Sequence, residues 1–148
     1  MYKVMFVCHG NICRSPMAEF VFRYMAGDRV YCESKAVSTE EIGHDIYPPA
    51  AAMLRRKGIP FQPHRARQIT RADYDAFDYI VVMEEYNLSR LWRIIGSDPK
   101  EKVYRLLDFT DTPGDIEDPW YSQNFERVYE QIYGGCEALL RHITAQAK

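Results

Sequence analysis

The sequence predicts an α/β fold built on an open, mostly four-stranded parallel sheet with helices on both faces. Apolar runs alternate with helical patterns along the chain, which is the order that such a sheet requires. Two of these runs, residues 4–7 and 79–83, are apolar on both faces, as is typical of central strands covered on each side. The length of 148 residues suits one hydrophobic core, so we expect a single domain over residues 1–148.

The strands and the first helix can be placed from the same patterns. The expected strands cover residues 4–7, 30–34, 79–83 and 103–107. The first helix is expected over residues 17–25, where apolar residues recur at helical spacing. Pro16 lies at its start, where proline is well tolerated.

The ends of the remaining helices are marked by glycine or by a change of pattern. One helical pattern covers residues 50–57 and stops at Gly58, and another covers residues 84–95 and stops at Gly96. Glycine tolerates the left-handed conformation that closes many helices. The last helix is expected from Ser122 onward, because one long apolar face begins there.

The segment between the first strand and the first helix, residues 8–16, reads Cys-His-Gly-Asn-Ile-Cys-Arg-Ser-Pro. Successive backbone N–H groups and the helix dipole make an anion site at such a junction, so we expect a phosphate loop. Cys8 lies at its mouth and should ionise readily in that field. Arg14 adds a planar fork that can bind two phosphate oxygens at once. A nucleophile inside a phosphate cradle predicts a phosphatase that passes through a phosphocysteine.

The residues between the nucleophile and the arginine are expected to line the bound phosphate: His9, Gly10, Asn11, Ile12 and Cys13. The loop must turn tightly for its N–H groups to converge, and Gly10 and Asn11 tolerate the positive φ angle that helps this. Ser15 follows the arginine, and its hydroxyl beside the sulfur could stabilise the departing thiolate.

Phosphoryl transfer also requires an acid that protonates the departing oxygen. The candidate is Asp118, in the run Asp-Pro-Trp-Tyr, where Trp120 and Tyr121 can wall a slot for a flat phenol ring. Asp-Pro is also a common turn signal. Three nearby carboxylates therefore stay open as alternatives: Asp108, Asp111 and Asp115.

Charge and composition exclude several classes of partner. The formal net charge of −2 gives no reason to expect binding to nucleic acid or membrane. Met1 leads directly into the first strand without a signal peptide, and no apolar run could cross a bilayer, so we expect a cytoplasmic protein.

The four cysteines lack the spacing of a zinc site, so no metal or other cofactor is expected. Cys32 and Cys136 are expected to be buried as small apolar side chains.

The string Cys-x-Gly-Asn-x-Cys-Arg-Ser, followed by proline, resembles the loop of the low-molecular-weight protein tyrosine phosphatase family. The resemblance covers the chain from Val4 to about Ile143. It implies hydrolysis of phosphotyrosine in proteins, or of small aryl phosphates, through a phosphocysteine on Cys8. Asp118 and Trp120 match the family's Asp-Pro-aromatic motif, which implies that Asp118 is the general acid. Phosphate, sulfate and vanadate are the anions that such a site is expected to bind.

The resemblance also implies roles for residues around the loop. It implies that four side chains hold the loop in place: Asn11, Ser15, Ser34 and His64. It further implies a redox role in which Cys13 forms a reversible disulfide with Cys8 and protects it from over-oxidation.

The sequence departs from the family pattern at three places. His9 follows the nucleophile where relatives often carry leucine, and Glu84 stands where aspartate is common. Glu40 stands where many relatives carry the aromatic that forms the second wall of the slot. We therefore expect weaker stacking on the phosphotyrosine ring and a bias against acidic flanking residues.

Two alternative functions are weighed against the phosphatase. An arsenate reductase of the same fold needs two further cysteines that relay a disulfide, but residues 79–96 contain none, and Cys32 and Cys136 offer no close pair. A non-catalytic phosphate-binding or redox-sensing module would be expected to lose the nucleophile or the acid, and both are present.

Overall fold

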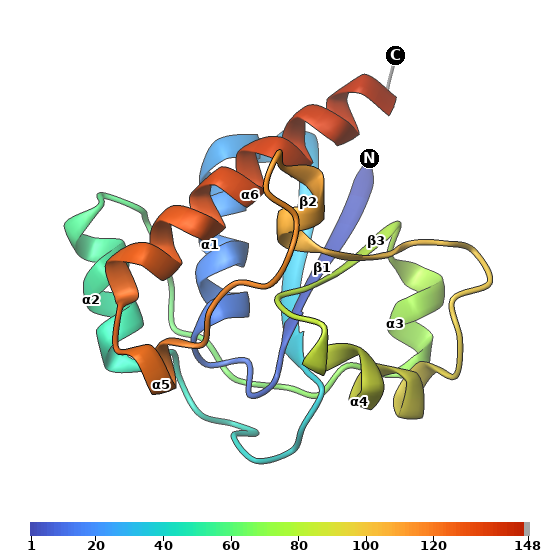
Figure 1. The fold of residues 1–148 in the computed structure, drawn as a ribbon, viewed down its shortest axis with the longest axis horizontal. Helices are drawn as coiled ribbons and strands as arrows, with labels where there is room; N and C mark the ends of the chain where they lie inside the picture. Colours follow the sequence, from blue (N-terminus) through green and yellow to red (C-terminus); the bar gives the residue numbers. More distant parts are fainter. Residues whose placement is uncertain (147–148) are drawn as a thin grey trace.

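The structure, a computed structural model, describes residues 1–146 of the chain. Within these residues, parallel strands form one four-stranded sheet in the order β2-β1-β3-β4 (Figure 1). The strands are β1 (Tyr2–Cys8), β2 (Val30–Ala36), β3 (Tyr79–Val82) and β4 (Val103–Arg105). The prediction of an α/β fold with a four-stranded parallel sheet is confirmed.

Helices cover both faces of this sheet, as predicted. They are α1 (Arg14–Ala26), α2 (Pro48–Arg56), α3 (Arg71–Ala76), α4 (Tyr86–Ile95), α5 (Pro119–Ser122) and α6 (Phe125–Gln146). Helices α1, α2 and α6 pack on one another on one side of the sheet, and α3 and α4 contact each other on the other side (Figure 1).

The side chains of the central strand β1 alternate between the two faces of the sheet, so the strand contributes to both cores. Val4, Phe6 and Cys8 are buried in the core formed with α1 and α6. Met5 and Val7 are buried in the second core, with residues of α3 and α4. Cys8 is the last residue of β1. The cysteine therefore lies at the carboxyl edge of the sheet, where open α/β sheets bind their ligands.

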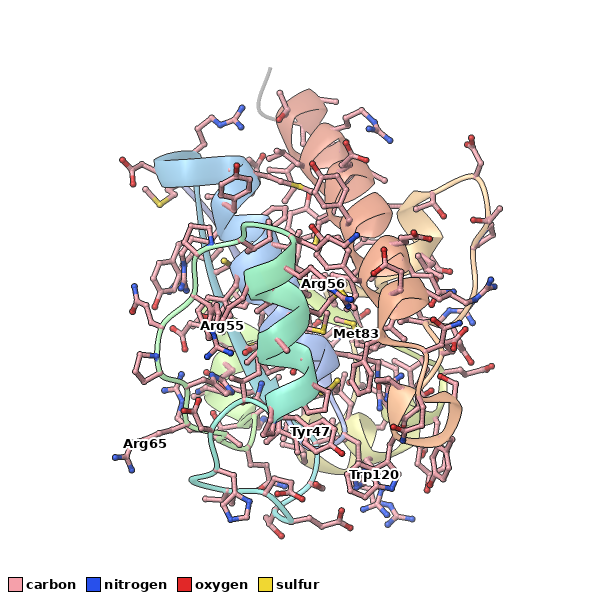
Figure 2. The ribbon with its side chains drawn as sticks, turned by 90° about the vertical axis from the view of Figure 1, so that its left-hand side faces the viewer. Tyr47, Arg55, Arg56, Arg65, Met83 and Trp120 are labelled. Atoms are coloured by element: carbon pink, nitrogen blue, oxygen red, sulfur yellow. The ribbon has the colours of Figure 1, made fainter. Side chains whose placement is uncertain are left out.

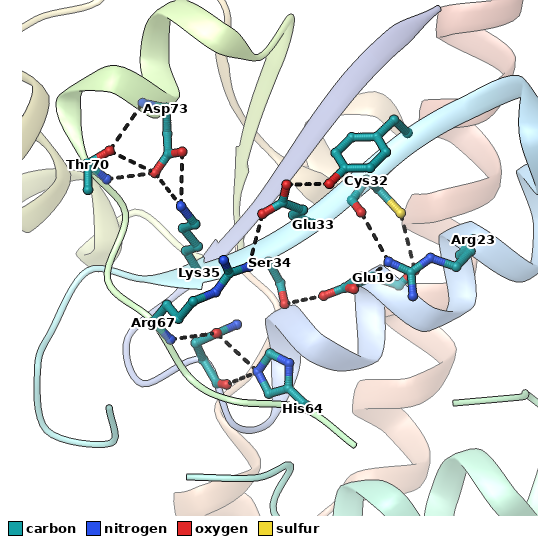
Figure 3. Close-up of polar contacts among 12 residues, drawn as sticks. Glu19, Arg23, Cys32, Glu33, Ser34, Lys35, His64, Arg67, Thr70 and Asp73 are labelled. Carbon is teal, nitrogen blue, oxygen red and sulfur yellow. Dashed lines mark hydrogen bonds and ion pairs between the residues drawn. The ribbon is translucent and has the colours of Figure 1, made fainter. Parts of the chain in front are cut away.

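Helix α3 was not predicted, because six residues are too few to show an apolar period. Its local signal is a capping box, in which Thr70 Oγ1 accepts the Asp73 N–H and Asp73 accepts the Thr70 N–H. Lys35 of β2 also donates to Asp73, which links this helix to the edge strand (Figure 3).

Several expected boundaries were wrong. The first helix begins at Arg14 rather than at Met17, and α4 begins at Tyr86 rather than at Glu84. Two further errors have a local cause. The last helix begins at Phe125 rather than at Ser122, because Gln123 adopts a left-handed conformation (φ 59°) that separates it from the short helix α5. The fourth strand ends at Arg105, because Leu106–Phe109 turn into a 3-10 helix. Both errors come from local turns that interrupt an otherwise continuous apolar pattern.

Two neighbouring glycines in α6 provide a matched test of this packing. A Cβ atom on Gly135 would lie 2.6 Å from Leu106 Cγ, whereas a Cβ on Gly134 would meet nothing within 4 Å. We expect Gly135→Ala to destabilise the protein by about 1–3 kcal/mol through overpacking. Gly134→Ala should instead stabilise it by about 0.5–1 kcal/mol, the helix preference of alanine. Urea unfolding measures both, and equal effects of the two changes would contradict the packing of α6 on Leu106.

Candidate active site

The phosphate loop occupies the five residues between the end of β1 and the start of α1. Cys8 ends the strand and Arg14 begins the helix. Asn11 has φ 59°, a left-handed conformation that asparagine tolerates better than most residues. Gly10 does not adopt a positive φ, but a Cβ there would lie 3.2 Å from Glu41 Cγ. Asparagine therefore supplies the tight turn, and glycine supplies the close approach.

Neighbouring segments hold the loop by its carbonyl groups. The N–H groups of Val37 and Ser38 donate to the carbonyls of Cys8 and His9, at 3.0 and 3.1 Å. The Tyr47 N–H donates to the carbonyl of Ile12 at 2.7 Å. These bonds engage three carbonyls with groups outside the loop, which suits an anion site, where N–H groups rather than carbonyls must face the ligand.

Two donors stabilise the sulfur of Cys8, which is only 4 % exposed. The Asn11 N–H points at Sγ from 3.3 Å, and Ser15 Oγ lies 3.0 Å from it. The Ser15 oxygen already accepts a hydrogen bond from Asn11 Nδ2 at 2.8 Å, so its own proton is available for the sulfur. The sulfur thus lies between a backbone N–H and a hydroxyl group.

Asn11 is in turn oriented by His64 and Arg67. His64 Nε2 lies 2.8 Å from the Asn11 carbonyl oxygen and 3.1 Å from Oδ1, and the Arg67 N–H donates to Oδ1 at 3.3 Å. Because both neighbours of Nε2 are acceptors, this nitrogen carries the proton. A relay of hydrogen bonds thus runs from His64 through Asn11 and Ser15 to Cys8.

Ser34 lies outside this relay, contrary to the expectation. Its hydroxyl donates to Glu19 Oε1 at 2.6 Å rather than to Asn11 (Figure 3). An ionised carboxylate is a stronger acceptor than an amide oxygen that His64 and Arg67 already occupy. Glu19 was missed by sequence reasoning, although an acidic residue one helical turn after Ser15, on a buried face, could have indicated it.

The guanidinium of Arg14 is buried and held on one edge. Nη1 and Nη2 lie 3.1 and 3.3 Å from the two Glu84 oxygens, and Nη1 also donates to the Ile116 carbonyl at 2.9 Å. Burial alone would lower the pKa of Arg14, but the charge of Cys8 and the bond with Glu84 raise it above its ordinary value. Glu84 takes the edge formed by Nη1 and Nη2, so the edge formed by Nε and Nη2 is the one available for bidentate binding of an anion.

Asp118 is the candidate acid that contacts the loop arginine. Its Oδ2 lies 3.6 Å from Arg14 Nη2, while its Oδ1 caps α5 by accepting the Trp120 N–H at 3.0 Å. Asp108 and Asp115 pair instead with Arg105, at 3.1 and 3.2 Å. The fourth candidate, Asp111, is exposed in the preceding segment.

Of the two aromatic residues that follow Asp118, Trp120 packs against an aromatic residue that sequence reasoning missed. Trp120 and Tyr121 are 60 % and 84 % exposed. The Trp120 ring lies 5.5 Å from the ring of Tyr47, centroid to centroid (Figure 2). Tyr47 also packs on Phe125 and anchors Ile12 through its N–H. The sequence gives no signal for Tyr47, because its role depends on packing between distant segments.

Glu40 lies beside the loop and contacts it through a polar bond. His9 Nε2 lies 2.9 Å from Glu40 Oε2, and the Glu40 side chain is 65 % exposed. A carboxylate is therefore hydrogen-bonded to the residue that follows Cys8. The two departures at His9 and Glu40 are coupled, since each residue is the polar partner of the other.

The four cysteines, all within the described residues, are free thiols. Burial, followed by the charge of Cys8, raises the pKa of Cys13 well above its ordinary value. Burial also raises the pKa of Cys32 to about 12 and that of Cys136 well above its ordinary value. Cys32 and Cys136 are buried, as expected from their apolar surroundings. These three sulfurs stay protonated at neutral pH.

Residues 1–146 show neither a metal-binding cluster nor a membrane-spanning helix. No group of three or more His, Cys, Asp or Glu side chains in this part of the chain is arranged to hold a metal ion. None of the helices described there has the length and apolar character needed to cross a membrane.

Comparisons with known proteins agree on one family. Residues 3–148 match the family model described as "Low molecular weight phosphotyrosine protein phosphatase". The low molecular weight protein-tyrosine-phosphatase YfkJ of Bacillus subtilis is 39 % identical, with 97 % of this chain and 96 % of that protein covered. The low molecular weight phosphotyrosine protein phosphatase of Sus scrofa is 38 % identical, with 95 % of each chain covered.

Solved structures of similar proteins share the fold of this chain. The crystal structure of YfkJ superposes with a TM-score of 0.94 at 38 % identity, over 100 % of this chain and 98 % of that one. The drosophila arginine phosphatase DARP superposes with a TM-score of 0.83 at 29 % identity, over 95 % of this chain and 97 % of that one.

The raised pKa values predict selective labelling of one thiol. Alkylation needs a thiolate, so iodoacetamide at neutral pH should modify Cys8 first and leave Cys13, Cys32 and Cys136 unmodified. Labelling of Cys32 should increase only in strongly alkaline solution, near its raised pKa of about 12. Peptide mapping by mass spectrometry measures this, and rapid labelling of Cys13 at neutral pH would contradict it.

Proposed function

The chain belongs to the low molecular weight phosphotyrosine protein phosphatase family, and on that premise we propose that it acts through a phosphocysteine on Cys8 with Asp118 as general acid. The family membership makes it a cysteine-dependent protein tyrosine phosphatase, a hydrolase of phosphoric monoesters. The main support for these residue roles is the distance of 3.6 Å between Asp118 Oδ2 and Arg14 Nη2. This contact brings a carboxyl group to the loop that contains Cys8.

In the first step, the Cys8 thiolate attacks phosphorus and the bond from phosphorus to the phenol oxygen breaks. The free edge of Arg14 and the inward N–H groups of the loop bind the phosphoryl oxygens. Asp118 transfers its proton to the departing phenol oxygen, which leaves a carboxylate behind.

In the second step, a water molecule attacks the phosphocysteine and the phosphorus–sulfur bond breaks. The Asp118 carboxylate accepts a proton from that water, which restores the acid. The sulfur leaves as a thiolate, and the Ser15 hydroxyl and the Asn11 N–H stabilise it. Inorganic phosphate is the product.

The substrates that we propose are phosphotyrosine residues in proteins and small aryl phosphates. The Tyr47 and Trp120 rings support this, since they form an aromatic surface near the acid. Phosphate, sulfate and vanadate should bind as competing anions. The net charge of −2 supports neither a nucleic-acid nor a membrane partner.

We also propose that residues 1–148 act as one phosphatase domain in the cytoplasm. The family match over residues 3–148 supports one unit. Four free thiols, one of them the proposed nucleophile, support a reducing compartment.

The alternative reactions have less support. The raised pKa values of the buried Cys32 and Cys136 make both poor relays for an arsenate reductase. Because DARP is an arginine phosphatase with this fold, phosphoarginine is a comparison substrate. Metal-free turnover of peptides with phosphotyrosine, phosphoserine or phosphoarginine tests the assignment, and we expect phosphotyrosine to react fastest.

Substitution of the two loop residues separates chemistry from binding. Cys8→Ser should abolish turnover of p-nitrophenyl phosphate and keep affinity for phosphate, because the cradle remains. Arg14→Ala should lose both, since the fork contacts ground state and transition state alike. Arg14→Lys is the matched control that keeps the charge without the fork. Substantial turnover by Cys8→Ser would exclude the proposed nucleophile.

Leaving groups of different pKa test the acid. Asp118→Ala should slow poor aryl leaving groups by roughly 10²–10⁴-fold, the usual contribution of a general acid. The loss should shrink for phenols of low pKa, which need little help from a proton. Asp111→Ala is the matched control, and an equal loss across all leaving groups would assign Asp118 a structural role.

Oxidation tests the proposed pairing of Cys8 with Cys13. Peroxide should oxidise the Cys8 thiolate to a sulfenic acid, which then condenses with the Cys13 thiol to a disulfide and releases water. A thiol reductant should restore activity. Because the pKa of Cys13 is raised, the disulfide should form faster in alkaline solution than at neutral pH.

Cys13→Ser should therefore recover poorly after peroxide, whereas Cys32→Ser should recover like the wild type. A disulfide from Cys8 to Cys32 or Cys136, or full recovery of Cys13→Ser, would refute the pairing.

A further inference from the structure

The turn that follows β3 sets two of the contacts that hold Arg14. Glu84, in this turn, binds both terminal nitrogens of the guanidinium. The carbonyl of Met83, one residue earlier, accepts the Ile116 N–H at 2.9 Å. Ile116 then places its own carbonyl 2.9 Å from Arg14 Nη1. The shape of one short turn thus determines where the arginine fork lies.

Asn87, in the first turn of α4, hydrogen-bonds to the backbone of the turn that follows β3. Its Oδ1 accepts the N–H of Met83 at 3.2 Å and the N–H of Glu84 at 3.1 Å. Its own N–H donates to the Glu84 carbonyl at 3.0 Å. The residue is fully buried. Its side chain therefore fixes the backbone of both residues that determine the Arg14 contacts.

The amide nitrogen of Asn87 indicates why the residue is there. Within residues 1–146, the buried Nδ2 atom has no hydrogen-bond partner. An unpaired buried donor is costly, so the oxygen must contribute enough to offset it. The side chain acts through its acceptor alone.

We propose that Asn87 is a positioning residue for phosphate binding: by holding the Met83–Glu84 backbone, it aims Glu84 and Ile116 at the Arg14 guanidinium. The inference rests on the proposed function only in taking Arg14 as the phosphate-binding group. Without the Asn87 oxygen, two N–H groups lose their acceptor and the turn relaxes. Arg14 keeps its charge but loses its fixed orientation, and Asp118, 3.6 Å away, competes for it.

The first experiment measures binding of inorganic phosphate by calorimetry, which needs no turnover. Asn87→Ala should weaken phosphate binding by roughly tenfold, the effect of one misaligned charge-assisted hydrogen bond. Thr70→Ala is the matched control, because it also removes a side-chain acceptor at the start of a helix, and Thr70 hydrogen-bonds to Asp73 rather than to the turn that holds Arg14. That control should lower Tm and leave phosphate binding unchanged.

A conservative variant separates positioning from folding. Asn87→Asp keeps the acceptor and removes only the unpaired amide, and the start of α4 favours a negative charge. It should bind phosphate within about threefold of the wild type, because the turn keeps both of its hydrogen bonds. If Asn87→Ala does not fold, Asn87→Asp and Asn87→Ser carry the same comparison, since the serine hydroxyl is too short to reach both N–H groups.

A double-mutant cycle tests the route through Glu84. In a Glu84→Gln background, most of the effect of Asn87→Ala on phosphate binding should vanish, because the two residues act as one unit. Additive losses would overturn the proposal, as would wild-type affinity in Asn87→Ala or an Asn87→Asp variant as weak as Asn87→Ala. If the wild type itself neither binds phosphate nor hydrolyses p-nitrophenyl phosphate, the proposed function fails instead.

Discussion

The proposed mechanism depends on a sulfur that reacts as an anion where little water reaches it. Cys8 is 4 % exposed, and a buried charge is costly unless it is paired and hydrogen-bonded. The protein supplies the Asn11 N–H, the Ser15 hydroxyl and a buried guanidinium. The left-handed turn at Asn11 follows from this need, because only a tight loop brings these donors to one point.

The buried arginine beside the sulfur must itself be stabilised by partners. Arg14 is itself buried, at 3 % exposure, so it requires partners that fix it without neutralising its free edge. Because β1 and β3 are neighbours in the sheet, their carboxyl ends place Cys8 and Glu84 beside each other. The segment that carries the acid then hydrogen-bonds to Met83 through Ile116, which brings Asp118 to the same guanidinium. The proposed nucleophile, the arginine fork and the proposed acid are thus arranged by two adjacent strand ends.

Sequence reasoning reached the parts of this arrangement that are local. The sheet follows from strands that are apolar on both faces, and the positions of Cys8 and Arg14 follow from one continuous string. It failed where a contact depends on competition between hydrogen-bond acceptors or joins residues that are far apart in the sequence. Ser34 bonds to Glu19 because a carboxylate outcompetes an occupied amide. Tyr47 reaches the loop through its N–H bond to the Ile12 carbonyl, and its ring packs on Trp120. The ion pair between Glu84 and Arg14 joins residues that are 70 positions apart in the sequence.

The central claim is that the phosphoryl group passes through the sulfur of Cys8. The most direct measurement is rapid quenching of the enzyme during turnover of a labelled aryl phosphate, followed by peptide mapping of the label. We expect the phosphoryl group on the peptide that contains Cys8, bonded to sulfur. Label on the Ser15 hydroxyl or on another side chain, or turnover with no labelled peptide at any quench time, would contradict the mechanism.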